Sequence, residues 1–407
     1  MAELDSIAAE ARERVESIGA ADLLIGLPAC ASGESLETVA SGLRSAFPKT
    51  VLVYPPAAIP GVNRNGDESA PDARVQLLPY PFVPVERRDG RVQPDDLRSV
   101  FLIGQKLGTR SCAVLNSDID SSTPAALRAL LEPVLNQGFD LAVPYYARRK
   151  FDGLINSAAV YPLTRALYGK RVHYPMAQDL ACSARLVGWC LQPASSRPVP
   201  LSWMTVNAVC AGLQVCQVSL GLAPPPKDTA DLSAVLASVL GSLFQDLDRN
   251  VMFWQRSRGS QAVRTFGQLE AAPEESPAVD VRKMIDAFHL GCRDLMEIWA
   301  AVLSPATLME LRKLAKIPPD QFRLPDDVWV RLVYDFALGY RQRVMNRDHL
   351  LRAMTPAYLA WVASFALEVQ DAGPRQVEAR LERLCLAFEA QKPYLVSRWR
   401  WPDRFNP

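Results

Sequence analysis

Short hydrophobic runs alternate with helix-like segments through the first half of the chain. In the helix-like segments, apolar residues recur every three or four positions, as they do on one face of a helix. Strands that are apolar throughout and joined by helices are typical of a mostly parallel sheet covered on both faces. The pattern therefore predicts an α/β fold with strands near residues 23–27, 51–54, 75–78, 112–115 and 141–143, and helices near 35–47, 95–107 and 124–135.

The last third of the chain has a purely helical pattern. Apolar residues recur at spacings of three and four within residues 281–302 and 377–388. Ser304-Pro305 and Thr355-Pro356 each join a capping residue to a proline at the first helical position. Such stripes are more typical of packing between helices than of a cofactor site, so we expect an all-α C-terminal domain.

A polar segment lies between these two regions. Residues 257–278 are rich in charged and polar side chains and contain Pro273 and Pro277. This composition is typical of a connector between domains. We therefore expect a first domain at 1–256, a linker at 257–278 and a helical domain at 279–407.

The composition is that of a folded, nearly neutral protein. Of the 407 residues, 49% are hydrophobic and 22% are charged, which provides for large cores and excludes a disordered chain. Lys and Arg number 45 against 44 Asp and Glu, so no basic field supports dedicated nucleic-acid binding. The alternating basic and aromatic residues at 398–401 are accordingly expected to pack on the helical domain.

The cysteine content and the N-terminal residues indicate the cellular compartment of the protein. Eight cysteines without a C-x-x-C pair indicate reduced thiols, and three histidines are too few for a His-rich zinc site. Residues 3–16 are acidic and amphipathic, where an export signal would be basic and then apolar. The apolar stretch 234–244 is shorter than the roughly 20 residues that span a bilayer. We expect a cytoplasmic protein with no transmembrane segment.

One acidic motif stands where a parallel sheet binds ligands. Asn116-Ser-Asp118-Ile-Asp120 follows directly after the run at 112–115, and ligands of such sheets bind beyond the carboxyl ends of the strands. Carboxylates there can hold a divalent cation, which in turn neutralises a diphosphate. Asp and Asn also favour ordinary turns, and a bare motif of this kind after a strand is structural more often than functional.

Three further stretches carry a resemblance to a known family. They are residues 146–153, the run V-Y-P-L-T-R-A-L-Y-G at 160–169, and Pro-Met-Ala-Gln-Asp at 175–179. Together they resemble the GT-A glycosyltransferases around mannosylglycerate synthase and glucosyl-3-phosphoglycerate synthase, and the similarity extends over nearly the whole chain. The resemblance implies a GT-A (Rossmann-like, mostly parallel) nucleotide-sugar domain. It also implies transfer of a hexose, with retention, from a nucleotide diphosphate sugar to a small acceptor such as a hydroxy acid.

The resemblance also assigns roles to individual residues. It implies a weak, nucleotide-dependent Mg²⁺ or Mn²⁺ site at Asp118 and Asp120, and a catalytic carboxylate beside the donor sugar at Asp179. Acceptor binding falls on Arg148, Asp152 and Asn156, and a homo-oligomer is compatible with the family. The implied contacts to the nucleotide sugar are Pro28, Glu34, Arg91, Asn116, Asp118 and Gln178.

Several family positions are altered in this chain. An amide, Asn116, replaces the first carboxylate of the family's D-x-D motif, and Leu201 stands where a catalytic carboxylate is expected. Residues 54–57 lack the acidic nucleotide-gripping turn, and residues 222–226 lack the metal-binding histidine. These departures leave open a degenerate, non-catalytic relative that acts as a binding or scaffold subunit. Hydrolysis by two paired carboxylates is less well supported, because no such pair is evident.

The surviving polar residues each have a structural alternative. Arg148 and its basic neighbours also fit a solvated charge run, and Asp152 before Gly153 also fits a turn. Asp179 also fits a cap of a following helix. His173 is expected to pack locally rather than to bind metal.

Overall fold

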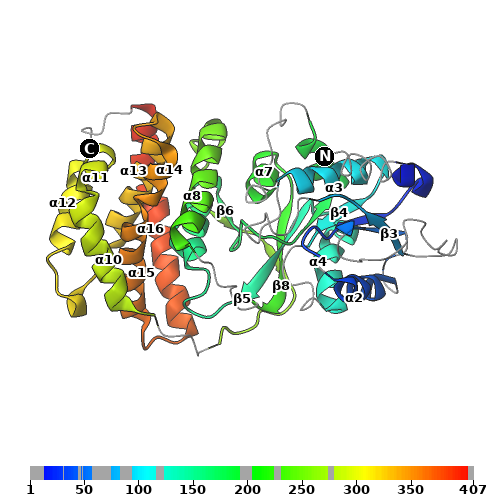
Figure 1. The fold of residues 1–407 in the computed structure, drawn as a ribbon, viewed down its shortest axis with the longest axis horizontal. Helices are drawn as coiled ribbons and strands as arrows, with labels where there is room; N and C mark the ends of the chain where they lie inside the picture. The colour runs from blue at the N-terminus through cyan, green and yellow to red at the C-terminus, as the bar shows by residue number, and fades with distance from the viewer. Residues whose placement is uncertain are drawn as a thin grey trace. The chain divides into compact units, whose positions relative to one another are not determined.

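The computed structural model describes residues 13–30, 32–44, 47, 49–56, 75–82, 94–115, 123–192, 204–223, 231–273 and 279–401. The chain forms two compact units, each described below by itself (Figure 1). The α/β unit consists of Met1–Tyr146, Tyr174–Pro224 and Val263–Leu269, and the helical unit consists of Ala147–His173, Pro225–Ala262 and Glu270–Pro407. The chain therefore passes between the units several times, whereas the sequence pattern suggested a single crossing at 257–278.

The α/β unit is built on one eight-stranded sheet with the order β10-β8-β5-β7-β4-β1-β2-β3. Strand β1 pairs in parallel with β2 and β4, β2 with β3, and β8 with β10, while β7 runs antiparallel to both β4 and β5. This confirms the predicted α/β fold with a mostly parallel sheet. The strands are β1 (Leu23–Gly26), β2 (Thr50–Tyr54), β3 (Val75–Pro79), β4 (Ser111–Val114), β5 (Leu141–Ala147), β7 (Leu180–Ser183), β8 (Val215–Leu222) and β10 (Arg264–Phe266).

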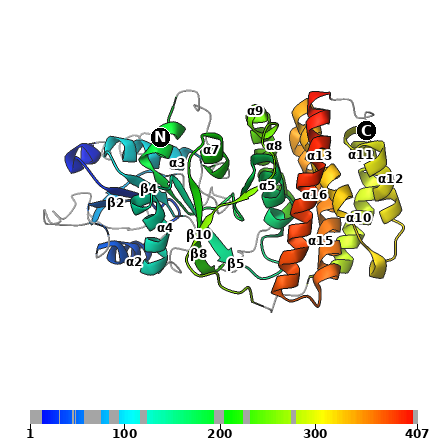
Figure 2. The same cartoon turned by 180° about the vertical axis from the view of Figure 1, so that it is seen from behind.

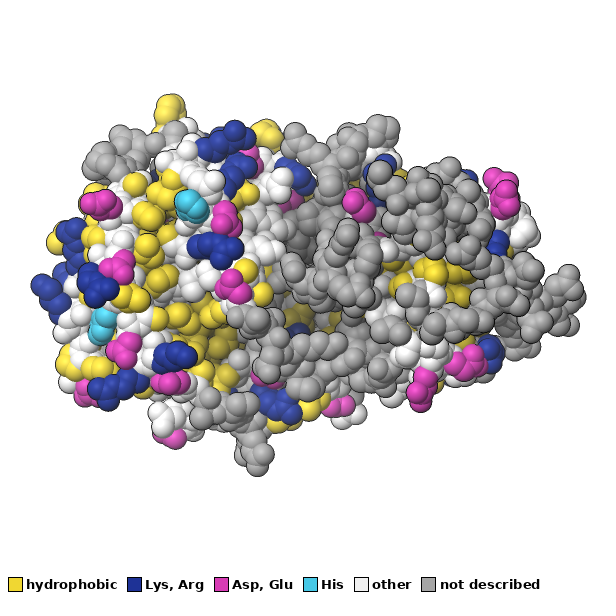
Figure 3. Space-filling model, in the orientation of Figure 1, with side chains coloured by type: hydrophobic (Ala, Val, Ile, Leu, Met, Phe, Trp, Pro, Cys, Tyr) yellow, Lys and Arg dark blue, Asp and Glu magenta, His cyan; other side chains and the backbone are white. Residues whose placement is uncertain are grey.

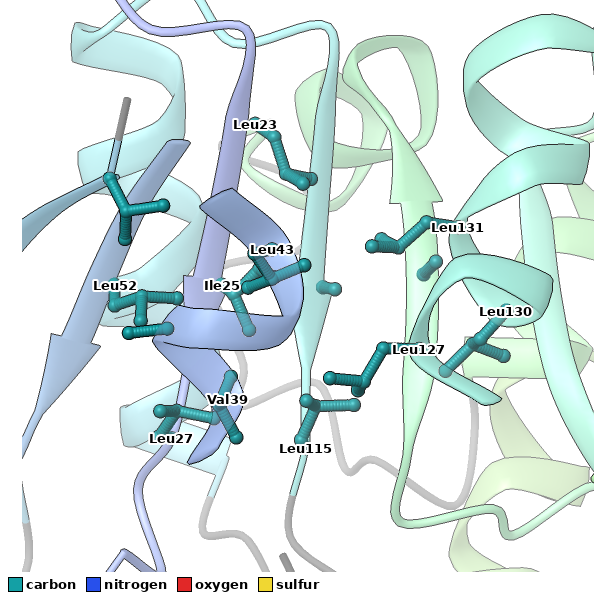
Figure 4. Close-up of a cluster of buried hydrophobic side chains, with 14 of the residues drawn as sticks. Leu23, Ile25, Leu27, Val39, Leu43, Leu52, Leu115, Leu127, Leu130 and Leu131 are labelled. Atoms are coloured by element: carbon teal, nitrogen blue, oxygen red, sulfur yellow. The ribbon is translucent and has the colours of Figure 1, made fainter. Parts of the chain in front are cut away.

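Helices cover both faces of this sheet, which explains why β1, β2 and β4 are buried at every position. Helices α2 (Gly33–Arg44) and α4 (Pro124–Asn136) share one face, where Val39 lies beside Leu27 and Leu127 beside Leu115 (Figure 4). Helix α3 (Pro94–Lys106) lies close to the other face, since a Cβ added to Gly26 would stand 2.4 Å from Val100 of α3. The unit also contains the short helices α6 (Ala184–Cys190) and α7 (Met204–Cys210) and a helical segment at residues 13–18.

The helical unit packs around a long C-terminal helix, α16 (Pro374–Arg400), which contacts α5 (Tyr161–Tyr168) and α13 (Asp326–Gln342) (Figure 2). Its remaining α-helices are α8 (Leu232–Arg249), α9 (Val251–Trp254), α10 (Val281–Asp294), α11 (Met296–Val302), α12 (Pro305–Leu314), α14 (Arg347–Arg352) and α15 (Thr355–Val369). A π-helix, η4 (Asn156–Val160), a short 3-10 helix, η7 (Pro319–Gln321), and the paired strands β6 (Lys170–Arg171) and β9 (Gln261–Ala262) complete it. Basic and acidic side chains are interspersed on its visible face, in keeping with the balanced charge (Figure 3).

Most local signals for helix starts hold in the structure. The Thr123 hydroxyl accepts from the Ala126 N–H at 3.1 Å, and the Ser304 hydroxyl accepts from the Thr307 N–H at 3.3 Å. Thr355 is an exception: it lies inside the first turn of α15, after Met354, and its hydroxyl donates to Ser233 instead. The apolar stripe over 281–302 is buried as expected at several positions, but it is divided between α10 and α11, which are separated at Leu295.

Only part of the aromatic and basic run at 398–401 packs within the helical unit as expected. Trp399 is 3% exposed and meets Trp254 edge to face at 5.1 Å between ring centroids. Arg398 forms an ion pair with Asp335, a carboxylate that is fully buried. Trp401, by contrast, is 70% exposed, so packing accounts for Arg398 and Trp399 but not for the whole pattern at 398–401.

One helical stretch within the described residues, Arg347–Val369, is long and apolar enough to cross a membrane by length and composition. The stretch considered from the sequence, 234–244, was a different one. In the structure, 72% of the most apolar part of Arg347–Val369 is buried inside the protein. A core helix of a folded domain passes the same test, so the stretch is weak evidence for a membrane span.

Asp246 of α8 is a buried acid whose removal should stabilise the helical unit. Its side chain is buried, with the Tyr168 hydroxyl donating at 2.8 Å and the Asn250 amide at 2.9 Å. Burial raises the pKa of Asp246 to about 6 from 3.8. The folded protein therefore holds an extra proton between these values, and stability falls as pH rises through that window.

We expect Asp246→Asn to raise stability at pH 7.5 by on the order of 2 kcal/mol, because an amide keeps hydrogen bonds without a buried charge. Urea unfolding at pH 4, 6 and 7.5 would measure this. The variant should also show a smaller fall in stability between pH 4 and 6 than the parent protein. An unchanged pH profile would contradict the assigned ionisation.

Candidate functional site

The carboxyl edge of the sheet brings together the end of β4 and the start of β7. Because these strands are antiparallel, with Val114 opposite Leu180, the chain leaving β4 at Leu115 runs beside the chain entering β7 from Asp179. The Leu115 N–H donates to the Gly26 carbonyl at 3.0 Å, which continues the ladder with β1. Asp179 is only 4% exposed. The pairing thus places one buried carboxylate at the strand end from which the sequence runs into Asn116.

Tyr146, near the end of β5, contacts this carboxylate. Strand β5 is also antiparallel to β7, so its last residues lie near the beginning of β7. The Tyr146 hydroxyl donates to Asp179 Oδ2 at 3.3 Å, which is long for a hydrogen bond between oxygens. The Tyr174 hydroxyl donates to the Tyr146 carbonyl at 3.1 Å, and its ring lies 5.9 Å from that of Tyr145. Tyr146 therefore joins the carboxylate to a half-buried group of three tyrosines.

Two further predicted contacts lie after β1 at the same edge. The Leu27 N–H donates to the Val53 carbonyl at 2.8 Å, which holds the chain against β2 up to the buried Pro28. Glu34 is exposed in the first turn of α2, where a carboxylate interacts favourably with the positive end of the helix. The structure therefore places Pro28 and Glu34 close to each other along the chain, at the entrance to α2.

The remaining donor and metal positions fall outside the described residues. These are Arg91, Asn116, Asp118, Asp120 and the altered position Leu201. Among the described residues there is no group of three or more His, Cys, Asp or Glu side chains that could hold a metal ion. Gln178 is described, and it lies half-buried next to Asp179.

The predicted acceptor residues all belong to the helical unit. Asn156 opens the π-helix η4, and its amide donates to the His173 carbonyl at 2.9 Å. Arg148 packs against Gly153, where φ is +64° and an added Cβ would lie 3.0 Å from the guanidinium. Asp152 is largely buried, 3.7 Å from Arg149. The three predicted acceptor residues therefore lie within one short segment, residues 148–156.

The contacts of Lys150, His173 and Asp179 bear on the structural alternatives for these residues. The Lys150 ammonium donates to the Val369 and Gln370 carbonyls at the end of α15. His173 stacks on Tyr161 at 4.9 Å between ring centroids, in keeping with local packing. Asp179 does not cap the next helix, because the cap of α6 is Ser183, which accepts from the Leu186 N–H at 3.2 Å.

The most distinctive sequence run, at 160–169, serves mainly to hold the helical unit together. Arg165 has a fully buried side chain that pairs with Glu382 at 2.5 Å and with Glu389 at 2.7 Å, both on α16. Lys392 of the same helix donates to the Ala166 carbonyl at 3.0 Å, near the end of α5. Sequence reasoning did not foresee this ionic network, although an arginine in the middle of an apolar helix was a visible signal.

The tyrosines around Asp179 were likewise missed as site residues. Tyr146 and Tyr174 flank recognisable motifs, but their meeting depends on strand pairing between distant segments. No local spacing predicts that pairing.

No family model matches the chain, and no curated protein matches it either. Among solved structures, the glucosyl-3-phosphoglycerate synthase of Mycobacterium tuberculosis, in complex with Mn²⁺, UDP and phosphoglyceric acid, is similar at 18% identity over 58% of this chain and 81% of that one, with a TM-score of 0.37. A complex of the same enzyme with Mg²⁺ and UDP gives 18% identity, 58% and 82% coverage and a TM-score of 0.37.

A mannosyltransferase from Pyrobaculum calidifontis, in complex with GDP-Man and Mn²⁺, is similar over more of the chain. It shares 12% identity over 91% of this chain and 99% of that one, with a TM-score of 0.36. These neighbours are GT-A type glycosyltransferases, the group that the sequence motifs resemble. At TM-scores below 0.5 the likenesses do not assign a function to this chain.

Proposed function

We propose that this protein is a nucleotide-sugar glycosyltransferase. In this proposal it transfers a hexose, with retention, from a nucleotide diphosphate sugar to a small acceptor such as a hydroxy acid. The observation that carries the proposal is the antiparallel pairing of β4 and β7. It sets the buried Asp179 beside Leu115, the residue that leads directly into Asn116 and Asp118. A carboxylate and a D-x-D-like motif at one carboxyl edge are what a donor site in an α/β sheet requires.

Within this site each side chain has a distinct task. Asp179 accepts hydrogen bonds from the hydroxyls of the donor sugar, and burial fixes its position. Tyr146 orients that carboxylate through the 3.3 Å hydrogen bond. The rings of Tyr145 and Tyr174 offer an apolar surface with polar tips, suited to the mixed character of a sugar ring.

A divalent cation completes the proposal, with Asp118 and Asp120 as its protein ligands. When bound, Mg²⁺ or Mn²⁺ would neutralise charge on the leaving diphosphate. The described residues alone supply no metal cluster, so the fit rests on these two carboxylates of the sequence. Since Asn116 contributes no charge, we expect weak metal binding that depends on nucleotide, with phosphate oxygens and water filling the coordination shell.

For the acceptor we propose Arg148, Asp152 and Asn156. Arg148 can meet the carboxylate or phosphate of an acidic acceptor with a bidentate pair. Asn156 stands at the first position of a π-helix, an element that is frequent at functional sites. We further propose a cytoplasmic location and leave the homo-oligomer as a state to be measured by light scattering.

A second function is favoured by specific sequence features. Asn116, Leu201 and the segment 222–226 each lack a group that the resemblance assigns to metal or catalysis. A non-catalytic relative would have lost turnover and would act as a binding or scaffold subunit. Binding and turnover measurements therefore separate the two functions.

Nucleotide binding should appear first as thermal stabilisation. At about a hundredfold excess over Kd a ligand of the native state adds about 2.7 kcal/mol of stability, so we expect the melting temperature to rise by several degrees. The measurement compares UDP-, GDP- and ADP-sugars, each with and without Mn²⁺, and uses the matching nucleoside monophosphates as controls. Stabilisation by one nucleotide diphosphate sugar that requires Mn²⁺ supports the proposal. No effect from any donor would contradict both the transferase and a nucleotide-sugar-binding subunit, and would leave only a scaffold role.

A further inference from the structure

Two large apolar side chains project from the helical unit without a packing role. Trp401 is 70% exposed and Met252 is 67% exposed, the highest values among the large hydrophobic residues that the structure describes. Each lies two positions from a buried tryptophan, Trp399 and Trp254 respectively. Residues two positions apart are about 200° apart around a helix, so Met252 of α9 points away from the core that Trp254 enters. Burial in the core therefore does not account for either exposed side chain.

Both side chains lie at one end of the helical unit, where α9 runs beside the last turn of α16 (Figure 2). Trp254 and Trp399 meet there edge to face, at 5.1 Å between their ring centroids. One residue after each of these rings, the Arg400 Nε donates to the Gln255 Oε1 at 2.9 Å. The exposed residues around this junction form what we call the α9–α16 surface: Arg249, Met252, Arg256, Arg400 and Trp401.

The charge of the α9–α16 surface is positive. Arg249, Arg256 and Arg400 are exposed, and none of them forms an ion pair with an acid among the residues that the structure describes. Asp248 is exposed beside them, but it pairs with Arg341 at 3.3 Å, so its charge is offset. The negative ends of the α8 and α16 dipoles account in part for Arg249 and Arg400. A helix dipole does not account for the exposed apolar side chains beside these arginines.

Arginines around an exposed tryptophan and methionine fit an anionic lipid surface. Basic side chains are attracted to negatively charged headgroups. Tryptophan is enriched at the membrane–water interface, where both its apolar ring and its polar N–H find suitable surroundings. Single-stranded nucleic acid fits less well, because Met252 has no ring on which a base could stack and the chain as a whole carries a charge of only +1.

We propose that the α9–α16 surface docks the protein on an anionic lipid bilayer. The arginines contact the headgroups, and Trp401 and Met252 insert beside them at the boundary between headgroups and acyl chains. Binding of this kind is peripheral and reversible, because the apolar contact comes from two side chains rather than from a spanning helix. The proposal does not depend on sugar transfer, because no residue of this surface belongs to the proposed donor or acceptor site.

The test is co-sedimentation of the full chain with lipid vesicles. Vesicles of phosphatidylcholine and phosphatidylglycerol in equal parts are expected to bind at least about tenfold more tightly than vesicles of phosphatidylcholine alone, since each arginine near an anionic surface is worth about fivefold. Raising the salt from about 0.1 M to about 1 M should weaken this binding, because the screening length falls from about 10 Å to about 3 Å. Equal binding to both kinds of vesicle, or binding to neither, would overturn the proposal. Binding to oligouridylate but not to the anionic vesicles would also overturn it, in favour of a nucleic-acid site.

Two arginines at opposite ends of α16 provide a matched pair of variants. Arg400→Gln should lower the affinity for the anionic vesicles about fivefold. Arg375→Gln, in the first turn of the same helix and roughly 40 Å away, should leave the affinity unchanged. Both positions are exposed, so neither change is expected to disturb folding. Equal losses in the two variants would indicate a nonspecific charge effect and would contradict the proposed docking surface.

Fluorescence tests whether Trp401 itself meets the lipid. Brominated phosphatidylcholine in the anionic vesicles quenches tryptophans that contact its acyl chains, so we expect quenching in the parent protein. Trp401→Phe keeps an aromatic ring and should still bind, but it should lose most of the quenching. Trp401→Ser should lower the affinity at least about tenfold, because the apolar contact is lost. The control Met309→Ser, at a 57% exposed position on α12, should bind as the parent does. Undiminished quenching in Trp401→Phe would place the lipid contact on another part of the protein.

Discussion

Replacing Asp179 by asparagine is expected to lower the release of nucleoside diphosphate from the nucleotide sugar by about two to three orders of magnitude. Preorganised polar groups at a reacting centre are typically worth about 3–4 kcal/mol, and Asp179 is a buried carboxylate at the predicted donor edge. The substitution keeps size and an acceptor for Tyr146, so the loss reports charge rather than packing. The measurement is a coupled assay of diphosphate release over the donor panel.

Matched variants make this expectation specific. Tyr146→Phe removes only the orienting hydroxyl and should lower turnover by about tenfold or less, the worth of one weak hydrogen bond. Asp95→Asn, at an exposed position in the first turn of α3, should have no effect. Turnover that survives in Asp179→Asn would show that this carboxylate takes no part in catalysis.

Variants of the D-x-D-like motif provide an independent test in the same diphosphate-release assay. Asp118→Ala should abolish turnover, and Asn116→Asp should raise turnover or metal-dependent binding because it adds a charge beside the cation. In a non-catalytic relative, Asn116→Asp would change little, since Leu201 would still lack a carboxylate. No release from any donor by either the parent or Asn116→Asp would favour the binding-only function.

The sheet could be predicted from the sequence because its strands are buried on both sides. Leu23 and Ile25 face one helical layer and Leu24 faces the other, and each is at most 1% exposed. A run of this kind has no polar face and so stands out in the sequence. The helices between the strands could be placed for the complementary reason, since one side of α2 and of α4 remains in water.

The part of the site that could not be predicted depends on pairing between distant segments. Strand β7 is only four residues long, and it inserts between β4 and β5, which precede it in the chain. Its register alone decides that Asp179 lies beside Leu115 and near Tyr146. Neither its length nor its composition marks it as the strand that completes the site.

The division of the chain into two units could not be predicted from the sequence for a similar reason. Residues 147–173 follow a strand of the sheet, yet they belong to the helical unit. The Ala158 carbonyl accepts from Trp329, and Arg165 pairs with two acids on α16. These partners lie more than 150 positions later in the chain, so no local pattern reveals them. The segment that most strongly resembles a known family thus consists of residues whose contacts in the structure hold the helical unit together.

Arg165→Met should be strongly destabilising for the same structural reason. Arg165 is fully buried and pairs with Glu382 and Glu389, so its removal leaves two carboxylates without their cation. Breaking a buried ion pair from one side typically costs about 3–5 kcal/mol. We expect the lower end, about 3 kcal/mol, because the Glu382 side chain keeps 43% of its exposure and can turn to water. Urea unfolding followed by helical circular dichroism would measure the loss.

Removing both sides of the network should restore much of that stability. In Arg165→Met with Glu382→Gln and Glu389→Gln no charge is left unpaired, and replacing whole buried ion networks is often neutral. The hydrogen bond from Arg165 lowers the pKa of Glu382, so its contribution is complete above pH 4.5 and is lost as pH falls through the lowered value. The variant should therefore lose less stability on acidification than the parent protein. The control Arg352→Met, in an exposed pair with Asp348, should barely move the unfolding midpoint. An equally small effect for Arg165→Met would show that this network does not hold α5 to α16.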